Sequence, residues 1–189
     1  MPSPEYDLAY LAACTPDLEE YVLSPVLFWP VNSRPPAGSP GFPRLTLGGL
    51  LLARRRLSAQ KDGGFRDSAL VNADGEIGRV REKWESNWAR KAATELPARL
   101  KQWENYLKEY MEDPGSRAGE FPTNVQLRVI LDLLFPEAGE GALPYEAVLS
   151  GLDRTLRTRL VEGDFCWVKE LESGFPKTKF WYLYGSLLD

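Results

Sequence analysis

Aromatic side chains between residues 84 and 110 are the first candidates for a binding site. Their spacing follows a helical repeat, so one helix would present them along one side. Tryptophan and tyrosine rings in such a stripe can stack on a ligand or anchor a protein partner, although packing in the core is their ordinary role. Two polar residues flank Trp88 and would border the same surface. The candidate binding residues are Trp84, Asn87, Trp88, Arg90, Trp103, Tyr106 and Tyr110.

Arg54, Arg55 and Arg56 form the basic cluster of the sequence. Guanidinium groups bind phosphate and carboxylate well, so an anion contact is one interpretation. The other is a solvated helix end, where cations oppose the negative pole of the helix dipole. Consecutive residues point in different directions around a helix, so the three side chains cannot all grip one ligand.

Many common catalytic chemistries are absent from the sequence. It contains no histidine, which removes the most frequent general base and metal ligand. It also lacks the glycine-rich phosphate loops and the CxxC, HExxH and GxSxG motifs. Cys14 and Cys166 are interpreted as buried reduced thiols, with a disulfide between them left open. No cofactor or metal site is expected, and whether the chain is an enzyme stays open.

Composition indicates a well-packed globular protein. The 189 residues are 43% hydrophobic and carry a net charge of −4, which favours a single domain over residues 1–189 and makes nucleic-acid binding unexpected. The first residues resemble no secretory signal. No apolar run approaches the roughly 20 residues that cross a membrane. We therefore expect a cytoplasmic protein with no membrane contact.

One long amphipathic helix dominates the pattern. Apolar residues recur every three or four positions from Ile77 to Tyr110, with a period of about 3.67. The stripe continues past Pro97, so we predict one helix over about 77–111, kinked or broken at that proline. Such a helix would be about 52 Å long, whereas a compact globule of this size is roughly 40 Å across. Its overhanging end would need an elongated fold or a second subunit.

The sequence also predicts shorter helices on both sides of the long helix in the chain. Start signals at Ser3 and Thr15 predict helices over about 4–13 and 16–23. A leucine-rich segment predicts a helix over 43–58. A strand is the alternative there, because Gly48 and Gly49 disfavour a helix. A capping box at Thr123 opens a helix to Phe135. Another helix begins at 144 and continues until Gly163.

The remaining segments are predicted to be irregular or extended. Residues 26–31 form an apolar run that suits a short buried strand or plug, and residues 30–43 form a proline-rich loop. Residues 61–75 are predicted to be a turn-rich loop with a small hairpin around 72–75. In the aromatic C-terminal tail, residues 164–189, two runs at 165–168 and 180–184 are predicted to be extended. The fold class is thus mainly α, a helical bundle built around the long helix, with a minor β element in the tail.

These features favour a non-enzymatic helical domain that binds a protein partner, most simply a second copy in a dimer. The tryptophans on an overlong apolar stripe are the basis of that hypothesis. The alternative is a small-molecule-binding protein or enzyme with a pocket between helices, lined by Trp84, Trp88, Tyr106 and Tyr110. A weaker alternative is phosphate or nucleic-acid contact through the arginine cluster.

Overall fold

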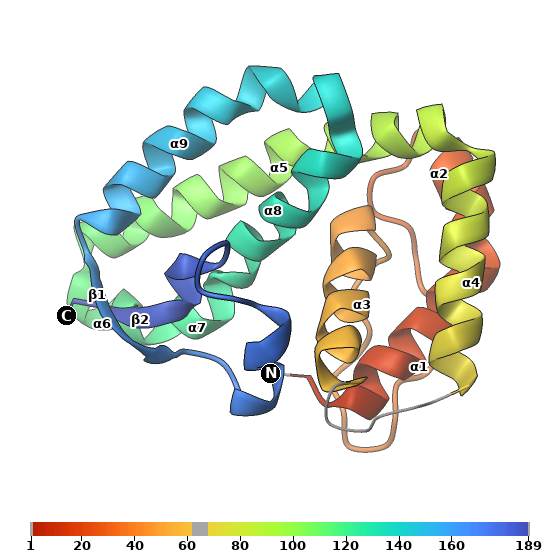
Figure 1. Cartoon of the computed structure of the whole chain (residues 1–189), viewed down its shortest axis with the longest axis horizontal. Coiled ribbons are helices and arrows are strands. Elements are labelled where there is room, and N and C mark those ends of the chain that lie inside the picture. Colours follow the sequence, from red (N-terminus) through yellow and green to blue (C-terminus); the bar gives the residue numbers. More distant parts are fainter. Residues whose placement is uncertain (1, 62–67, 189) are drawn as a thin grey trace.

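The computed structural model of the chain describes residues 2–61 and 68–188. Over these residues the protein is mainly α-helical, with a small antiparallel sheet near the C-terminus (Figure 1). This confirms the predicted fold class. The buried apolar side chains form one connected cluster that reaches from Tyr10 to Leu187.

The described residues before Trp84 form four α-helices. They are α1 (Pro4–Cys14), α2 (Leu18–Leu23), α3 (Leu47–Lys61) and α4 (Ser68–Lys83), with a 3₁₀ turn at Thr15–Asp17 between the first two. The Ser3 hydroxyl accepts a hydrogen bond from the amide of Tyr6 at 3.2 Å, which caps α1 as its sequence predicted. Thr15 is not the predicted N-cap, because the 3₁₀ turn begins there and its amide ends α1 by donating to the carbonyl of Leu11.

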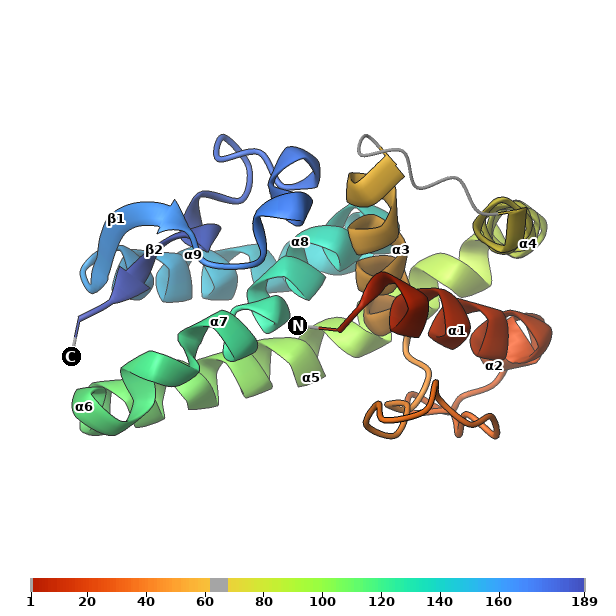
Figure 2. The same ribbon diagram turned by 90° about the horizontal axis from the view of Figure 1, so that it is seen from below.

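The second part contains five helices and the sheet. The helices are α5 (Glu85–Glu112), α6 (Pro114–Arg117), α7 (Phe121–Asn124), α8 (Gln126–Ala138) and α9 (Leu143–Arg157), and the strands are β1 (Leu160–Phe165) and β2 (Tyr184–Leu187). Short 3₁₀ turns lie at Ala118–Glu120, Gly139–Ala142, Lys169–Gly174 and Trp181–Leu183. Helices α8 and α9 pack along α5, while α1 and α3 pack beside each other on the N-terminal side (Figures 1 and 2).

The chain bends at Trp84, and this corrects the prediction of one helix over 77–111 that is kinked or broken at Pro97. Trp84 has φ −125° and ψ 41°, which are not helical torsions. Its amide still donates to Val80 and its carbonyl still accepts from Trp88, so a single residue redirects the chain. Helix α4 therefore lies at a steep angle to α5 (Figure 1).

Pro97 neither breaks nor ends α5, although proline was the expected weak point. The residue lies inside the helix on its exposed side. The carbonyl of Ala93, which has no amide partner at position 97, can therefore be hydrated there. Helix α5 is about 42 Å long. Apart from the half-buried Trp84, the apolar residues of the stripe are buried within the chain itself, from Ile77 and Val80 on α4 to Tyr110 on α5, so no overhanging end requires a second subunit.

Two predictions before the bend need correction. The segment predicted as a helix over 43–58 is helical from Leu47, and its strand rival is wrong. Gly48 is in close contact there, since a Cβ atom would lie 2.8 Å from Glu95 Oε1. The prediction of a loop over 61–75 is wrong for residues 68–75, because they belong to α4 and no hairpin forms at 72–75. Residues 62–67 lie outside the described residues.

The predicted boundaries after the bend also shift. The capping box at Thr123 is not formed, since α8 begins at Gln126 and continues through Pro136 to Ala138. Helix α9 ends at Arg157, and Gly163 lies within β1 instead of ending the helix. The strands lie at 160–165 and 184–187 and meet the predicted runs only at Phe165 and Tyr184, which pair with each other, whereas Trp181–Leu183 forms a 3₁₀ turn.

The proline-rich loop over 30–43 is confirmed, but the preceding apolar run is not a buried strand. Only Trp29 in that run makes a bridge, with Leu45. Val26 and Phe28 are 42% and 38% exposed, so the run lies largely on the surface.

Candidate functional site

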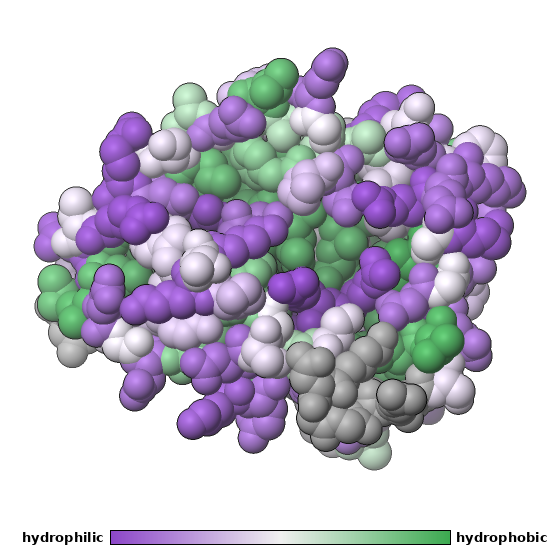
Figure 3. Space-filling view, in the orientation of Figure 1, coloured by the Kyte–Doolittle hydropathy of each residue, from purple (hydrophilic) through white to green (hydrophobic). Residues whose placement is uncertain are grey.

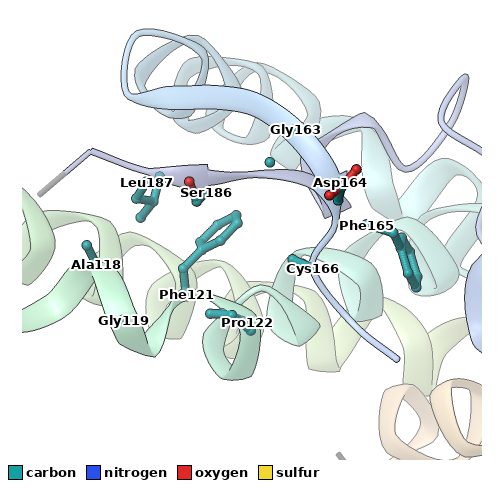
Figure 4. A pocket seen from close by; sticks show the side chains of 11 residues that line it. Ala118, Gly119, Phe121, Pro122, Gly163, Asp164, Phe165, Cys166, Ser186 and Leu187 are labelled. Atoms are coloured by element: carbon teal, nitrogen blue, oxygen red, sulfur yellow. The ribbon is translucent and has the colours of Figure 1, made fainter. Parts of the chain in front are cut away.

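A cleft of about 510 Å³ opens between the C-terminal sheet and α7 (Figure 4). One wall comes from the α7 side, where the Phe121 side chain points toward the strands. The other wall comes from the two strands and the turn after β1. We call this the sheet cleft, and its lining residues are Ala118, Gly119, Phe121, Pro122, Gly163, Asp164, Phe165, Cys166, Gly185, Ser186 and Leu187.

An irregularity in the sheet shapes the strand wall. Glu162 pairs with Gly185 and Phe165 pairs with Tyr184, so Gly163 and Asp164 have no partner residue in β2. Such a bulge bends and twists a strand locally. Gly185 permits the close strand approach, because a Cβ atom there would overlap the carbonyl of Val161. The sequence thus places two unpaired residues of β1 at the wall of the cleft.

Three aromatic hydrogen-bond donors fix the walls of the sheet cleft. The Tyr106 hydroxyl donates to the carbonyl of Arg117 at 3.2 Å, directly before the α7-side wall. The Tyr110 hydroxyl donates to the carbonyl of Leu188 at 2.9 Å, directly after β2. The indole of Trp167 donates to the carbonyl of Pro122 at 2.7 Å. The cleft is therefore held by bonds from α5 and from the turn after β1, which makes it a preformed site.

The chemistry of the sheet cleft suits binding. Asp164 is the charged residue of the lining, is exposed, and forms no ion pair with a described residue. Burial raises the pKa of the Cys166 thiol to about 12, so at neutral pH it is a protonated thiol and a poor nucleophile. The glycine-rich wall exposes backbone, and the exposed Pro122 supplies apolar surface above the buried Phe121 and Leu187. The cleft can therefore hold an apolar side chain, a backbone segment and one cation.

The predicted aromatic residues do not meet in one pocket. Trp88 and Tyr106 are eighteen residues apart on one helix, or about 27 Å. Trp88 is buried and donates to Glu137 Oε2 at 2.8 Å. Tyr106 and Tyr110 lie at the other end of α5, where they support the sheet cleft without lining it.

The other predicted residues of the stripe are also dispersed. Trp103 is fully buried and stacks on Tyr106, with ring centroids 5.6 Å apart. Trp84 is half-buried at the bend, with the Lys83 ammonium 5.2 Å from its ring centroid. Asn87 is half-buried and Arg90 is exposed on the first turns of α5.

The three arginines diverge as their consecutive positions require. Arg54 Nε donates to Asp74 Oδ1 at 2.9 Å, and Arg55 Nε donates to the carbonyl of Gly174 at 2.8 Å. Arg56 is 6% exposed and holds Asp7 through two hydrogen bonds of 2.7 and 2.6 Å. The cluster is therefore neither a shared anion site nor a solvated helix end.

No sequence pattern identified the sheet cleft in advance. Its residues come from three separate stretches, 118–122, 163–166 and 185–187. Gly163 resembled a helix stop, and its real role depends on pairing with residues more than twenty positions later. Only the glycines and the predicted extended tail gave any signal.

Two other kinds of feature are absent from residues 2–61 and 68–188. No helix there is long and apolar enough to span a bilayer. In the same residues, no cluster of three or more cysteine, aspartate or glutamate side chains could hold a metal ion.

The chain was compared with models of protein families, with curated proteins and with solved structures, and none of the three comparisons found a match.

Proposed function

We propose that the chain is a protein-interaction domain whose sheet cleft binds an extended segment of a partner protein. The observation that carries the proposal is the bulge in β1, where Gly163 and Asp164 have no partner in β2 and line the cleft. An extended peptide that pairs with such a strand gains main-chain hydrogen bonds, while nearby pockets select its side chains.

The lining indicates which side chains the segment carries. The exposed Pro122 lies over the buried Phe121 and Leu187, and this apolar side of the cleft suits an aliphatic or aromatic side chain. Asp164 offers a carboxylate without an ion-pair partner among the described residues, and it suits a lysine or arginine one or two positions away. The proposed ligand is therefore an extended segment with alternating apolar and basic residues.

A different protein fits the cleft better than a second copy. The expectation of a dimer rested on an overlong helix, and the bend at Trp84 removes that reason. Pairing of β1 between two copies would also bring Glu162 and Asp164 of each copy together. Like charges opposite each other in a sheet are destabilising.

A peptide array tests this proposal. Peptides of about twelve residues, which are immobilised on the array support and vary in apolar and charged content, are probed with the labelled chain. The blocking variant is Gly119→Trp, because a Cβ atom at Gly119 has no atom within 4 Å and the added ring has room beside the cleft. The control is Gly115→Trp, an equally open glycine that does not line the cleft.

We expect the wild-type chain and Gly115→Trp to retain the same apolar and basic peptides, and Gly119→Trp to lose them. Asp164→Asn is expected to keep the apolar preference and lose the basic one. Equal binding by Gly119→Trp and wild type would contradict the proposal, as would an array on which no peptide is retained. Sedimentation showing a dimer that Gly119→Trp dissociates would identify a second copy as the occupant and overturn the choice of partner.

A further inference from the structure

A second hollow of about 260 Å³ lies where α1, α3, α5 and α8 meet, and it shares no lining residue with the sheet cleft. We call it the arginine pocket. Its rim is exposed at Pro2, Pro43 and Arg44, so a ligand can enter from solvent. Figure 2 shows the start of α1 close to α3 and α8, the elements that enclose this pocket.

Two of its three arginines are fixed in place by the protein. The Arg56 side chain is 8% exposed, and Asp7 takes two of its five N–H groups. The Arg99 side chain is 13% exposed, donates to Glu95 Oε1 at 2.7 Å and donates to Thr46 Oγ1 at 2.8 Å. Guanidinium groups held in this way need no reordering to bind a ligand.

The charges in and behind the wall do not cancel. Arg44, Arg56 and Arg99 line the pocket, whereas Asp7 is its lining carboxylate and Glu95 lies behind the wall. Among the described residues, three cations therefore face two anions, and one positive charge is unbalanced. A concave site with surplus charge of one sign and low-dielectric walls concentrates ions of the opposite sign.

The rest of the lining suits an organic ligand. The rings of Tyr6 and Tyr10 and the side chains of Leu127 and Ile130 give the pocket an apolar side. The hydroxyl of Tyr6 already donates to the carbonyl of Gly41 at 3.0 Å, which fixes its ring. The pocket thus combines a cationic end with an apolar wall.

We propose that the arginine pocket binds a small organic oxyanion, a phosphate or carboxylate on a compact apolar body. The oxyanion contacts Arg56 and Arg99, and the exposed Arg44 closes over it from the rim. This site is independent of the sheet cleft, so it can stand whether or not the cleft binds a peptide.

Calorimetric titration with four probes tests the proposal. The probes are phenyl phosphate, benzoate, inorganic phosphate and, as a neutral control, benzyl alcohol. We expect phenyl phosphate or benzoate to bind saturably with a Kd of about 1 mM or below, and benzyl alcohol to give no binding. Comparison of phenyl phosphate with benzoate shows whether the pocket prefers a phosphate or a carboxylate.

Three variants locate the binding. Arg44→Ala is expected to weaken binding about tenfold through loss of one charge-assisted contact. Arg34→Ala, an exposed arginine of the same loop outside the pocket, is expected to bind as wild type. Gln126→Trp places a ring in the pocket from the half-buried first residue of α8 and is expected to abolish binding. Circular dichroism confirms that each variant is folded.

The proposal is overturned if neither organic anion binds at about 10 mM, including the case in which inorganic phosphate alone binds. It is also overturned if folded Arg44→Ala binds as tightly as Arg34→Ala, or if folded Gln126→Trp retains wild-type affinity.

Discussion

Replacement of Glu95 by leucine is expected to destabilise the chain by about 3 to 5 kcal/mol. The Glu95 carboxylate is fully buried and accepts hydrogen bonds from the amide of Gly48 at 2.9 Å and from Arg99 Nε at 2.7 Å. Leucine would leave a helix-terminal amide without its acceptor and a largely buried guanidinium without its carboxylate. Glu95→Gln keeps an acceptor for the amide and loses only the charge, so about 1 to 3 kcal/mol is expected.

Urea unfolding and thermal unfolding, both followed by circular dichroism, measure the free energy of unfolding and the Tm of both variants. For a chain of this size each 1 kcal/mol shifts Tm by about 2 to 4 °C, so Glu95→Leu is expected to melt about 6 to 20 °C lower. The control is Glu104→Leu on the same helix, since Glu104 is half-exposed and its one ion-pair partner within the described part of the chain is the exposed Lys101. Its expected change is below about 1 kcal/mol. Equal stability of Glu95→Leu and Glu104→Leu would refute the reasoning that buried charge pairing holds α3 to α5.

Three further predictions concern other parts of the fold. Gly48→Ala is expected to lower the free energy of unfolding by about 1 to 3 kcal/mol, because a Cβ atom would overlap α8 and crowd the buried Glu95 carboxylate. Gly75→Ala has open space within helix α4 and is expected to raise it by about 0.5 to 1 kcal/mol. Urea unfolding measures both variants, and a change of the same sign in both would contradict this prediction. Hydrogen bonds, of which the one from Lys83 has the largest effect, hold the pKa of Glu19 at about 2 in the folded chain. The ionised Glu19 therefore stabilises the folded chain at pH values above its unfolded pKa of about 4.5, and this stabilisation disappears as the pH falls from about 4.5 through 2. A carboxyl NMR titration is expected to show the midpoint at about 2, and an unchanged midpoint in Lys83→Ala would rule out this cause. Tyr110→Phe removes the hydroxyl that donates to the backbone carbonyl after β2. It is expected to lower the free energy of unfolding by about 1 kcal/mol and to speed amide hydrogen exchange in the sheet. Unchanged exchange would show that this hydrogen bond does not hold the cleft wall.

Local chemistry explains the parts of the fold that the sequence predicted. Ser3 before Pro4 begins α1 because a hydroxyl cap and a proline both suit a first helical turn. The buried positions of α5, from Trp88 to Tyr110, follow from apolar residues at helical spacing. Both features depend only on neighbours within a few residues.

The bend at Trp84 has no comparable local signal. The apolar stripe continues through it, and hydrogen bonds are kept on both sides, so only the torsions of one residue change. Pro97 is a strong helix breaker, yet its exposed position tolerates the missing hydrogen bond. Periodicity identifies which face is buried, but it does not give the direction of the next element.

The candidate site was harder to predict than the fold because tertiary pairing creates it. Gly163 is a strand residue only because Gly185 and its neighbours pair with β1. Tyr106 and Tyr110 were selected for a ligand pocket, whereas their hydroxyls bind backbone carbonyls beside the sheet cleft. Their role as ligand contacts stays a prediction, as do the roles of the other selected residues.

The most direct test of the central claim is an amide chemical-shift map of the isotope-labelled chain titrated with the tightest peptide from the array. The account predicts that the largest shifts lie at Gly119, Gly163, Asp164 and Gly185, the backbone of the sheet cleft. Shifts confined to α1 to α4, or the same map with Gly119→Trp, would contradict it.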